Sequence, residues 1–170
     1  MPNTATTILY IAALKKLQMI DSVFKTWETN RKIYLEFLNK YSLAQLNKIP
    51  SGFNNNLIWN VGHIIVSQQT LVYRLSNLPM YISDEQLDLY KNGTKPTGNT
   101  TQQEVDELKV LLLSNIEKTK ADFANQKFVT FTERLTLTGF LLSNLNDALE
   151  FNNYHEGMHL GMMMSLRKFV

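Results

Sequence analysis

Apolar residues recur every three or four positions over several long segments of this chain, and that spacing most constrains its fold. In residues 20–41 the large apolar side chains are Ile20, Val23, Phe24, Trp27, Tyr34, Phe37, Leu38 and Tyr41. The same spacing recurs over about residues 56–77, after Thr101, and from about Ser143 almost to Val170. It is typical of amphipathic helices that bury one face. The sequence therefore predicts four long helices.

Turn and capping signals lie between these segments. Pro50-Ser51-Gly52 marks a turn, and the run Asn54–Asn56 can cap the second helix. Ser83–Gln86 is a capping box that opens a short helix, and Thr101–Glu104 is a second box. Residues 128–142 alternate apolar residues with threonine, which favours an extended or hairpin-like segment. We expect an all-α four-helix bundle with long connections, a short N-terminal helix, and a hairpin-like segment before the last helix.

Composition bounds the domain organisation and the partners. We expect one bundle domain over residues 19–170, preceded by a helical N-terminal extension over residues 1–18. Seventeen basic residues face 15 acidic ones, and no basic run exceeds a pair, so nucleic acid is not an expected partner. The apolar stretch 8–14 is too short for a membrane span and lacks the preceding basic residues of a secretory signal. With no cysteine in the chain, we expect a cytoplasmic protein that does not bind membranes.

The chain has three histidines, and their positions favour a single site. His155 and His159 are four residues apart, so a helix places both rings on one face, with Cβ atoms about 5–6 Å apart. The rest of that face is mostly apolar, and a buried imidazole needs a hydrogen-bond partner or a cation. His63 lies on a polar stripe at the edge of the second helix's apolar face, where a groove can form. We expect His63, His155 and His159 to bind one divalent ion, although structural core histidines are the alternative.

Three neutral nitrogen ligands suit zinc, nickel, iron or copper and leave a coordination position for water or substrate. Asn60, Thr70 and Asn152 lie on the same helix faces as the histidines, and we expect them to line the groove or to support the ligands. Glu156 is a candidate general base for a metal-bound water. Its alternative is a solvated or salt-bridged helix residue. Arg74 is a weaker candidate for holding an anionic substrate group, because it lies about 16 Å along the helix from His63.

Two known metal motifs match only in part. The pattern from His155 to His159 is H-E-x-x-H, as in zinc proteases, but no histidine or glutamate follows it in this sequence. Glu156-x-x-His159 is half of a di-iron bundle motif, yet the matching segment, Asn60-Val-Gly-His63, lacks the carboxylate. One ion per chain is therefore expected, and neither a peptidase nor a di-iron centre.

Longer strings around the histidines resemble the DinB/YfiT-like superfamily of bacterial four-helix proteins. These are Asn56-Leu-Ile-Trp-Asn-Val-Gly-His63, Phe151-Asn-Asn-Tyr-His-Glu-Gly-Met-His159-Leu-Gly, Leu78-Pro79-Met80 and Gly93-Thr-Lys-Pro-Thr-Gly98. The resemblance covers about residues 20–170. It implies a bundle that binds zinc or nickel through His63, His155 and His159, and it implies a homodimer. Some similar proteins are metal-dependent thiol S-transferases or isomerases that activate a low-molecular-weight thiol, and others are called hydrolases.

We therefore expect a metal-dependent enzyme of the thiol S-transferase or hydrolase type that acts on a small molecule. Its cofactors would be one divalent ion per chain, zinc or nickel, and a low-molecular-weight thiol as cosubstrate. The alternative is a non-catalytic dimeric bundle in which the metal is structural or the bundle binds a ligand.

Overall fold

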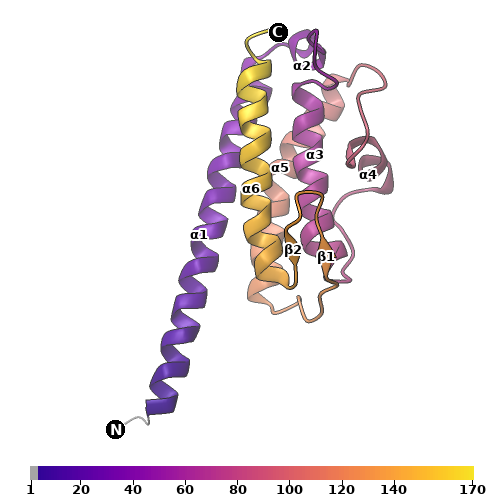
Figure 1. The fold of residues 1–170 in the computed structure, drawn as a ribbon. Coiled ribbons are helices and arrows are strands. Elements are labelled where there is room, and N and C mark those ends of the chain that lie inside the picture. Colours follow the sequence, from indigo (N-terminus) through magenta and orange to yellow (C-terminus); the bar gives the residue numbers. More distant parts are fainter. Residues whose placement is uncertain (1–3) are drawn as a thin grey trace.

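Four long helices form the body of the molecule in a computed structural model, which describes residues 4–170 without the side chains of residues 4–9 and 12–17. They are α1 (Thr4–Lys40), α3 (Leu57–Gln69), α5 (Gln102–Ala124) and α6 (Leu145–Leu166). Helix α1 packs against α5 and α6, and α3 packs against the same two helices (Figure 1). The predicted all-α bundle is confirmed.

The shorter elements lie in the connections. They are α2 (Leu43–Asn47), the π-helical turn η1 (Thr70–Arg74) that continues α3, α4 (Asp84–Tyr90), β1 (Arg134–Leu135) and β2 (Leu141–Leu142). The two strands pair antiparallel as the expected hairpin, and β2 packs against α6 (Figure 1). The Asn56 cap and the two predicted capping boxes are all present. The sequence did not predict α2, although Ser42 and Gln45 form a capping box there as well.

The N-terminal segment is helical, but it is not a separate short helix. It runs without a break into the first bundle helix, so that α1 has 37 residues and extends beyond the other helices (Figure 1). The sequence has neither glycine nor proline between Thr4 and Lys40, and nothing there favours a turn. The division at residue 18 stays a prediction, and residues 1–3 lie outside the described part of the chain.

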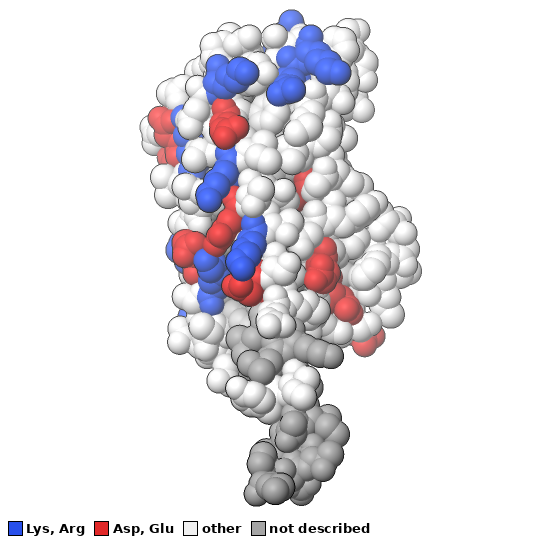
Figure 2. All heavy atoms as spheres, turned by 90° about the vertical axis from the view of Figure 1, so that its left-hand side faces the viewer, with Lys and Arg blue, Asp and Glu red and all other residues white. Residues whose placement is uncertain are grey.

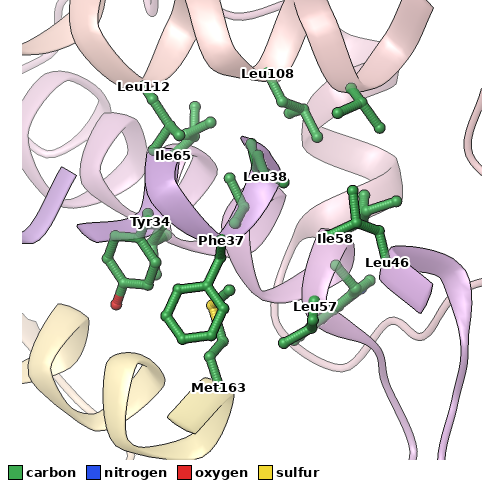
Figure 3. Packing of buried hydrophobic residues seen from close by; sticks show 14 of the residues in the cluster. Tyr34, Phe37, Leu38, Leu46, Leu57, Ile58, Ile65, Leu108, Leu112 and Met163 are labelled. Carbon is green, nitrogen blue, oxygen red and sulfur yellow. The ribbon is translucent and has the colours of Figure 1, made fainter. Parts of the chain in front are cut away.

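The core consists of two apolar clusters with polar side chains between them. One cluster contains Tyr34, Phe37, Leu57 and Leu112 (Figure 3), and the other surrounds Trp27. Along α1, Arg31 follows Trp27 by four residues and precedes Tyr34 by three, so it faces the interior between the two clusters. All three of these side chains are fully buried.

The surface on the α1 side carries charges of both signs. Figure 2 shows lysine and arginine interleaved with aspartate and glutamate on this face. Asp21 pairs with Lys25 at 2.9 Å, and Glu28 of α1 pairs with Lys120 of α5 at 2.6 Å. Such exposed pairs contribute little to stability, because water and salt screen them. Within the described residues, no helix has the length and hydropathy that a membrane span requires.

Candidate metal centre

The three histidines converge where α3 packs against α6. One ring nitrogen from each of His63, His155 and His159 lies within 4.8 Å of the others. The ring centroids of His155 and His159 are 4.7 Å apart, and that of His63 lies 5.2 Å from His155 and 4.8 Å from His159. Asn56 accepts a hydrogen bond from the Trp59 amide and so fixes the start of α3, one to two turns before His63. The expected convergence of two distant segments is therefore present.

The ring of His63 is held by three neighbours. Its Nδ1 lies 2.7 Å from the backbone oxygen of Tyr90, and its ring stacks on Trp59 at 4.7 Å between centroids. A carbonyl can only accept, so Nδ1 carries the proton and the lone pair is on Nε2. The hydroxyl of Ser67 lies 3.3 Å from that Nε2. His63 thus presents Nε2 as its potential ligand atom.

The ring of His159 is oriented by Asn60 across the helix interface. The amide nitrogen of Asn60 donates to the backbone oxygen of Asn56 at 2.7 Å, which leaves its Oδ1 facing His159. His159 Nδ1 donates to that oxygen at 2.8 Å, so Nε2 carries the lone pair. Partners of this kind orient metal-ligating imidazoles in proteins. Asn60 therefore orients His159, one of the three potential ligands.

His155 has no such partner. Its Nδ1 is buried and makes no hydrogen bond to any described residue. Burial lowers the pKa of His155 to about 3, with smaller contributions from charge repulsion by Arg31 and by His159 and His63 when they are protonated. A buried ring nitrogen without a partner is uncommon in folded proteins and calls for a ligand or an ordered water.

The protonation of the cluster fits a metal ion. Burial lowers the pKa of His159 to about 4, helped by the neighbouring His63. Burial also lowers the pKa of His63, and the hydrogen bond to Tyr90 offsets this only in part. All three imidazoles are therefore neutral at pH 7, which is the form that binds metal. The residues present can hold one divalent ion.

A groove of about 630 Å³ opens onto the cluster, and we call it the histidine groove. All three histidines line it, together with apolar residues such as Trp59, Leu71 and Phe151. The hairpin contributes Arg134 and, from its turn, Thr136, Leu137 and Thr138. A groove of this size can admit a small organic molecule. The predicted groove residue Thr70 lies in its lining, with its hydroxyl donating to the backbone oxygen of Val66 at 2.9 Å.

Glu156 points away from the histidine groove, which contradicts its expected role as a general base. The side chain is fully buried and is not part of the groove lining. Its Oε1 accepts from Arg31 Nη2 at 2.7 Å and from Asn152 Nδ2 at 2.9 Å. A carboxylate held this way by a guanidinium is not available to take a proton from a molecule in the groove. Asn152 therefore supports Glu156 and not a histidine.

Some residues at the centre were missed by the sequence reasoning. Tyr90 acts through a backbone carbonyl of α4, and no side-chain pattern reveals such an acceptor. Arg31 did have a signal, because it falls on the buried stripe of α1 between Trp27 and Tyr34. The hydroxyl of Tyr34 also donates to the backbone oxygen of Glu156, which ties α1 to α6 behind the centre.

The chain was also compared with known proteins. A comparison with curated proteins gave no match. The model of the DinB superfamily matches residues 26–163, which is most of the chain and includes all three histidines. The helical bundle and the three-histidine cluster agree with that match. The chain therefore belongs to the DinB superfamily.

Proposed function

We propose that the protein is a metal-dependent enzyme that activates a thiol or a water at a three-histidine site. The observation that carries the proposal is the histidine groove, which reaches all three potential ligands from outside. Among the described residues, no fourth histidine or carboxylate belongs to the cluster, so a bound ion would keep a position for an exogenous ligand. A purely structural ion would instead need a closed ligand set.

The chain's own residues would bind and orient. His63, His155 and His159 hold the ion, which when bound lowers the pKa of a coordinated thiol or water. Tyr90 and Asn60 keep His63 and His159 in the tautomer that has its proton on Nδ1 and its lone pair on Nε2. Trp59 and Phe151 give the groove apolar walls that exclude water from a bound substrate.

Thiol transfer is favoured over hydrolysis by the groove lining. No aspartate or glutamate is among the residues that line it, and Glu156 is held by Arg31. Metal-dependent hydrolysis usually relies on a base to take the proton from a water whose unperturbed pKa is about 15.7. A thiol has an ordinary pKa of about 8.5 and needs much less help. A low-molecular-weight thiol as cosubstrate, with zinc or nickel as the ion, is therefore our leading proposal.

The first experiment measures metal content in protein purified without a histidine tag. We expect about one zinc or nickel ion per chain. The variants His63→Ala, His155→Ala and His159→Ala should each bind at least about tenfold more weakly, because each loses one of three ligands. Tyr154→Ala, on the exposed side of α6, is the matched control and should bind as the wild type does. Metal binding that survives all three histidine substitutions would overturn the site.

The second experiment separates the reactions. We expect the metal-loaded protein to couple a small thiol to 1-chloro-2,4-dinitrobenzene, with turnover lost in His63→Ala. Ester hydrolysis without added thiol would instead select the hydrolase. Full metal occupancy with neither activity, in a site that no thiol can enter, would select the non-catalytic alternative.

A further inference from the structure

The histidine groove is lined by cations from three separate elements. Arg74 comes from η1, Lys91 caps the end of α4, and Arg134 begins β1. No aspartate or glutamate is among the residues that line the groove. The groove therefore has a positive potential that its own lining does not neutralise.

The three cations differ in whether they form ion pairs or hydrogen bonds with other residues of the protein. Lys91 pairs with Asp88 at 2.7 Å, so part of its charge is already balanced. Arg74 and Arg134 make no ion pair or side-chain hydrogen bond with any residue in the described part of the chain. Both residues are exposed. Their guanidinium groups can each offer two parallel donors to a carboxylate or a phosphate.

The position of Arg74 also sets the dimensions of a fitting ligand. It follows His63 by 11 residues on the α3–η1 helix, which is about 16 Å along the axis. Side chains on a helix lean towards its N-terminus, here towards His63, so an anion on Arg74 would lie on the order of 10 Å from the histidines. Between these two ends the groove wall is mainly apolar and includes Val66, Leu71 and Phe151.

From this placement we infer that the groove selects an organic anion, with Arg74 and Arg134 binding its carboxylate or phosphate and the histidine centre facing its other end. The middle of the ligand is apolar and lies along the α3 wall. The inference rests on the proposed function only for what happens at the histidine end. The anion site itself is made by Arg74 and Arg134 and does not need the ion.

The experiment compares two ligands that differ only in one end group, ω-mercaptooctanoate and ω-mercaptooctanol. Calorimetry with the cobalt-loaded full-length protein gives both affinities, and the cobalt spectrum reports whether the sulfur reaches the ion. We expect the acid to bind at least about tenfold more tightly than the alcohol, as charged hydrogen bonds predict. A phosphate-ended analogue distinguishes the two anions, the tighter binder identifying the preferred group.

Substitution assigns the preference to the two arginines. Arg74→Gln and Arg134→Gln should each reduce the ratio of the two affinities at least about threefold and leave the affinity for the alcohol unchanged. Arg74→Lys should keep part of the preference, because it keeps the charge and loses the paired donors. Lys48→Gln, an exposed cation at the end of α2, is the matched control and should change nothing.

The outcomes separate this inference from the proposed function. Equal affinities for acid and alcohol, or a preference that survives both arginine substitutions, would overturn the anion site. Absence of cobalt binding, or a cobalt spectrum that does not respond to either thiol, would overturn the thiol chemistry. Calorimetry would still test the anion site in that case, since it measures binding wherever the sulfur lies.

Discussion

At the scale of single residues, the buried ion pair of Arg31 and Glu156 is the most consequential feature outside the histidines. Both side chains have no exposed surface, and Arg31 Nη1 has no partner among the described residues. A buried pair need not stabilise a fold relative to apolar residues, but removal of one partner leaves an uncompensated charge in the interior. Because Glu156 adjoins His155 in sequence, that charge would lie next to the histidine cluster.

We therefore expect Arg31→Met to lower the free energy of unfolding by about 3–5 kcal/mol. The double variant Arg31→Met/Glu156→Met should lose much less, because it removes both charges together. Urea denaturation followed by circular dichroism measures both. If the single variant is as stable as the wild type, the pair does not have the buried character described here.

Much of the histidine centre follows from residue spacing, and the rest does not. Two histidines four residues apart must share a helix face. Asn60 lies one turn before His63 on the other helix, so it shares the face of His63. The sequence could therefore predict that these side chains lie at one site. The acceptor for His63 is a backbone carbonyl from a different element, and nothing in the sequence marks it. Glu156 was misplaced for a related reason. Its neighbour His155 faces the groove, but a step of one residue rotates a side chain by about 100° around the helix, towards Arg31.

At the scale of elements, α3 and α4 meet so closely that only glycine fits at position 62. A Cβ on Gly62 would lie 2.3 Å from a ring carbon of Tyr90, the residue whose carbonyl orients His63. Close approach holds for Gly62, whereas a Cβ on Gly157 or Gly161 would meet no atom of the described residues within 4 Å, apart from its chain neighbours and the backbone of its own helix.

We expect Gly62→Ala to destabilise the protein by about 1–3 kcal/mol, because the buried Tyr90 ring must move. The metal affinity should fall as well, since the carbonyl of Tyr90 moves with the ring. Gly157→Ala is the matched control and should stabilise by up to about 1 kcal/mol, the helix preference of alanine over glycine. Thermal unfolding and metal titration of both variants test this pair. A Gly62→Ala protein that resembles the Gly157→Ala protein in both would contradict the packing.

The helix starts could be predicted because their signals are local. Asn56, Ser83 and Thr101 each cap a helix through a bond to an amide three residues later. The π-helical turn η1 and the continuity of α1 were not predicted. The expected helix start at Met19 has no capping residue before it, which is consistent with the unbroken helix α1. The π-helical turn depends on how residues 70–74 pack between other elements.

At the scale of the whole molecule, a cluster around Asp122 joins α5 to η1 and to the connection after it. Its carboxylate accepts from the hydroxyls of Tyr73 and Tyr81, each at 2.9 Å, and pairs with Lys127 at 2.6 Å. Burial alone would raise the pKa of Asp122, but these three partners together lower it below its ordinary value of 3.8. The folded state therefore binds the Asp122 proton less readily than the unfolded chain does.

This cluster stabilises the fold fully above about pH 4 and progressively less as the pH falls through the lowered pKa. We expect Asp122→Asn to lower the melting temperature at pH 6. The difference from the wild type should shrink as the pH falls from about 5 to about 2.5, because the wild type then loses the same charge. Melting curves across this range measure it, and a difference that does not change with pH would contradict the assignment.

The homodimer that the family resemblance implies stays a prediction. We expect its interface on an exposed apolar stripe of α6. Tyr154, Met158 and Met162 follow one stripe at intervals of four residues and are 53, 42 and 41% exposed. Burial of such a stripe against a second copy would remove apolar area from water. In sedimentation equilibrium we expect twice the chain mass, reduced to the monomer mass in Tyr154→Lys/Met162→Lys. Val110→Lys, at an exposed apolar position of α5, is the control, and a wild type that is monomeric throughout would contradict the dimer.

The order of the ligands along the chain decides when a metal ion can first be held. During synthesis His63 emerges 92 residues before His155, and helix α3 offers only one imidazole until α6 exists. A single imidazole retains no divalent ion for long, so a nascent chain passes through most of its length without metal. If the protein binds a metal ion, loading would therefore occur on the assembled protein, through the mouth of the groove. An ion that binds only the folded protein would stabilise the folded state and would not direct the earlier steps of folding.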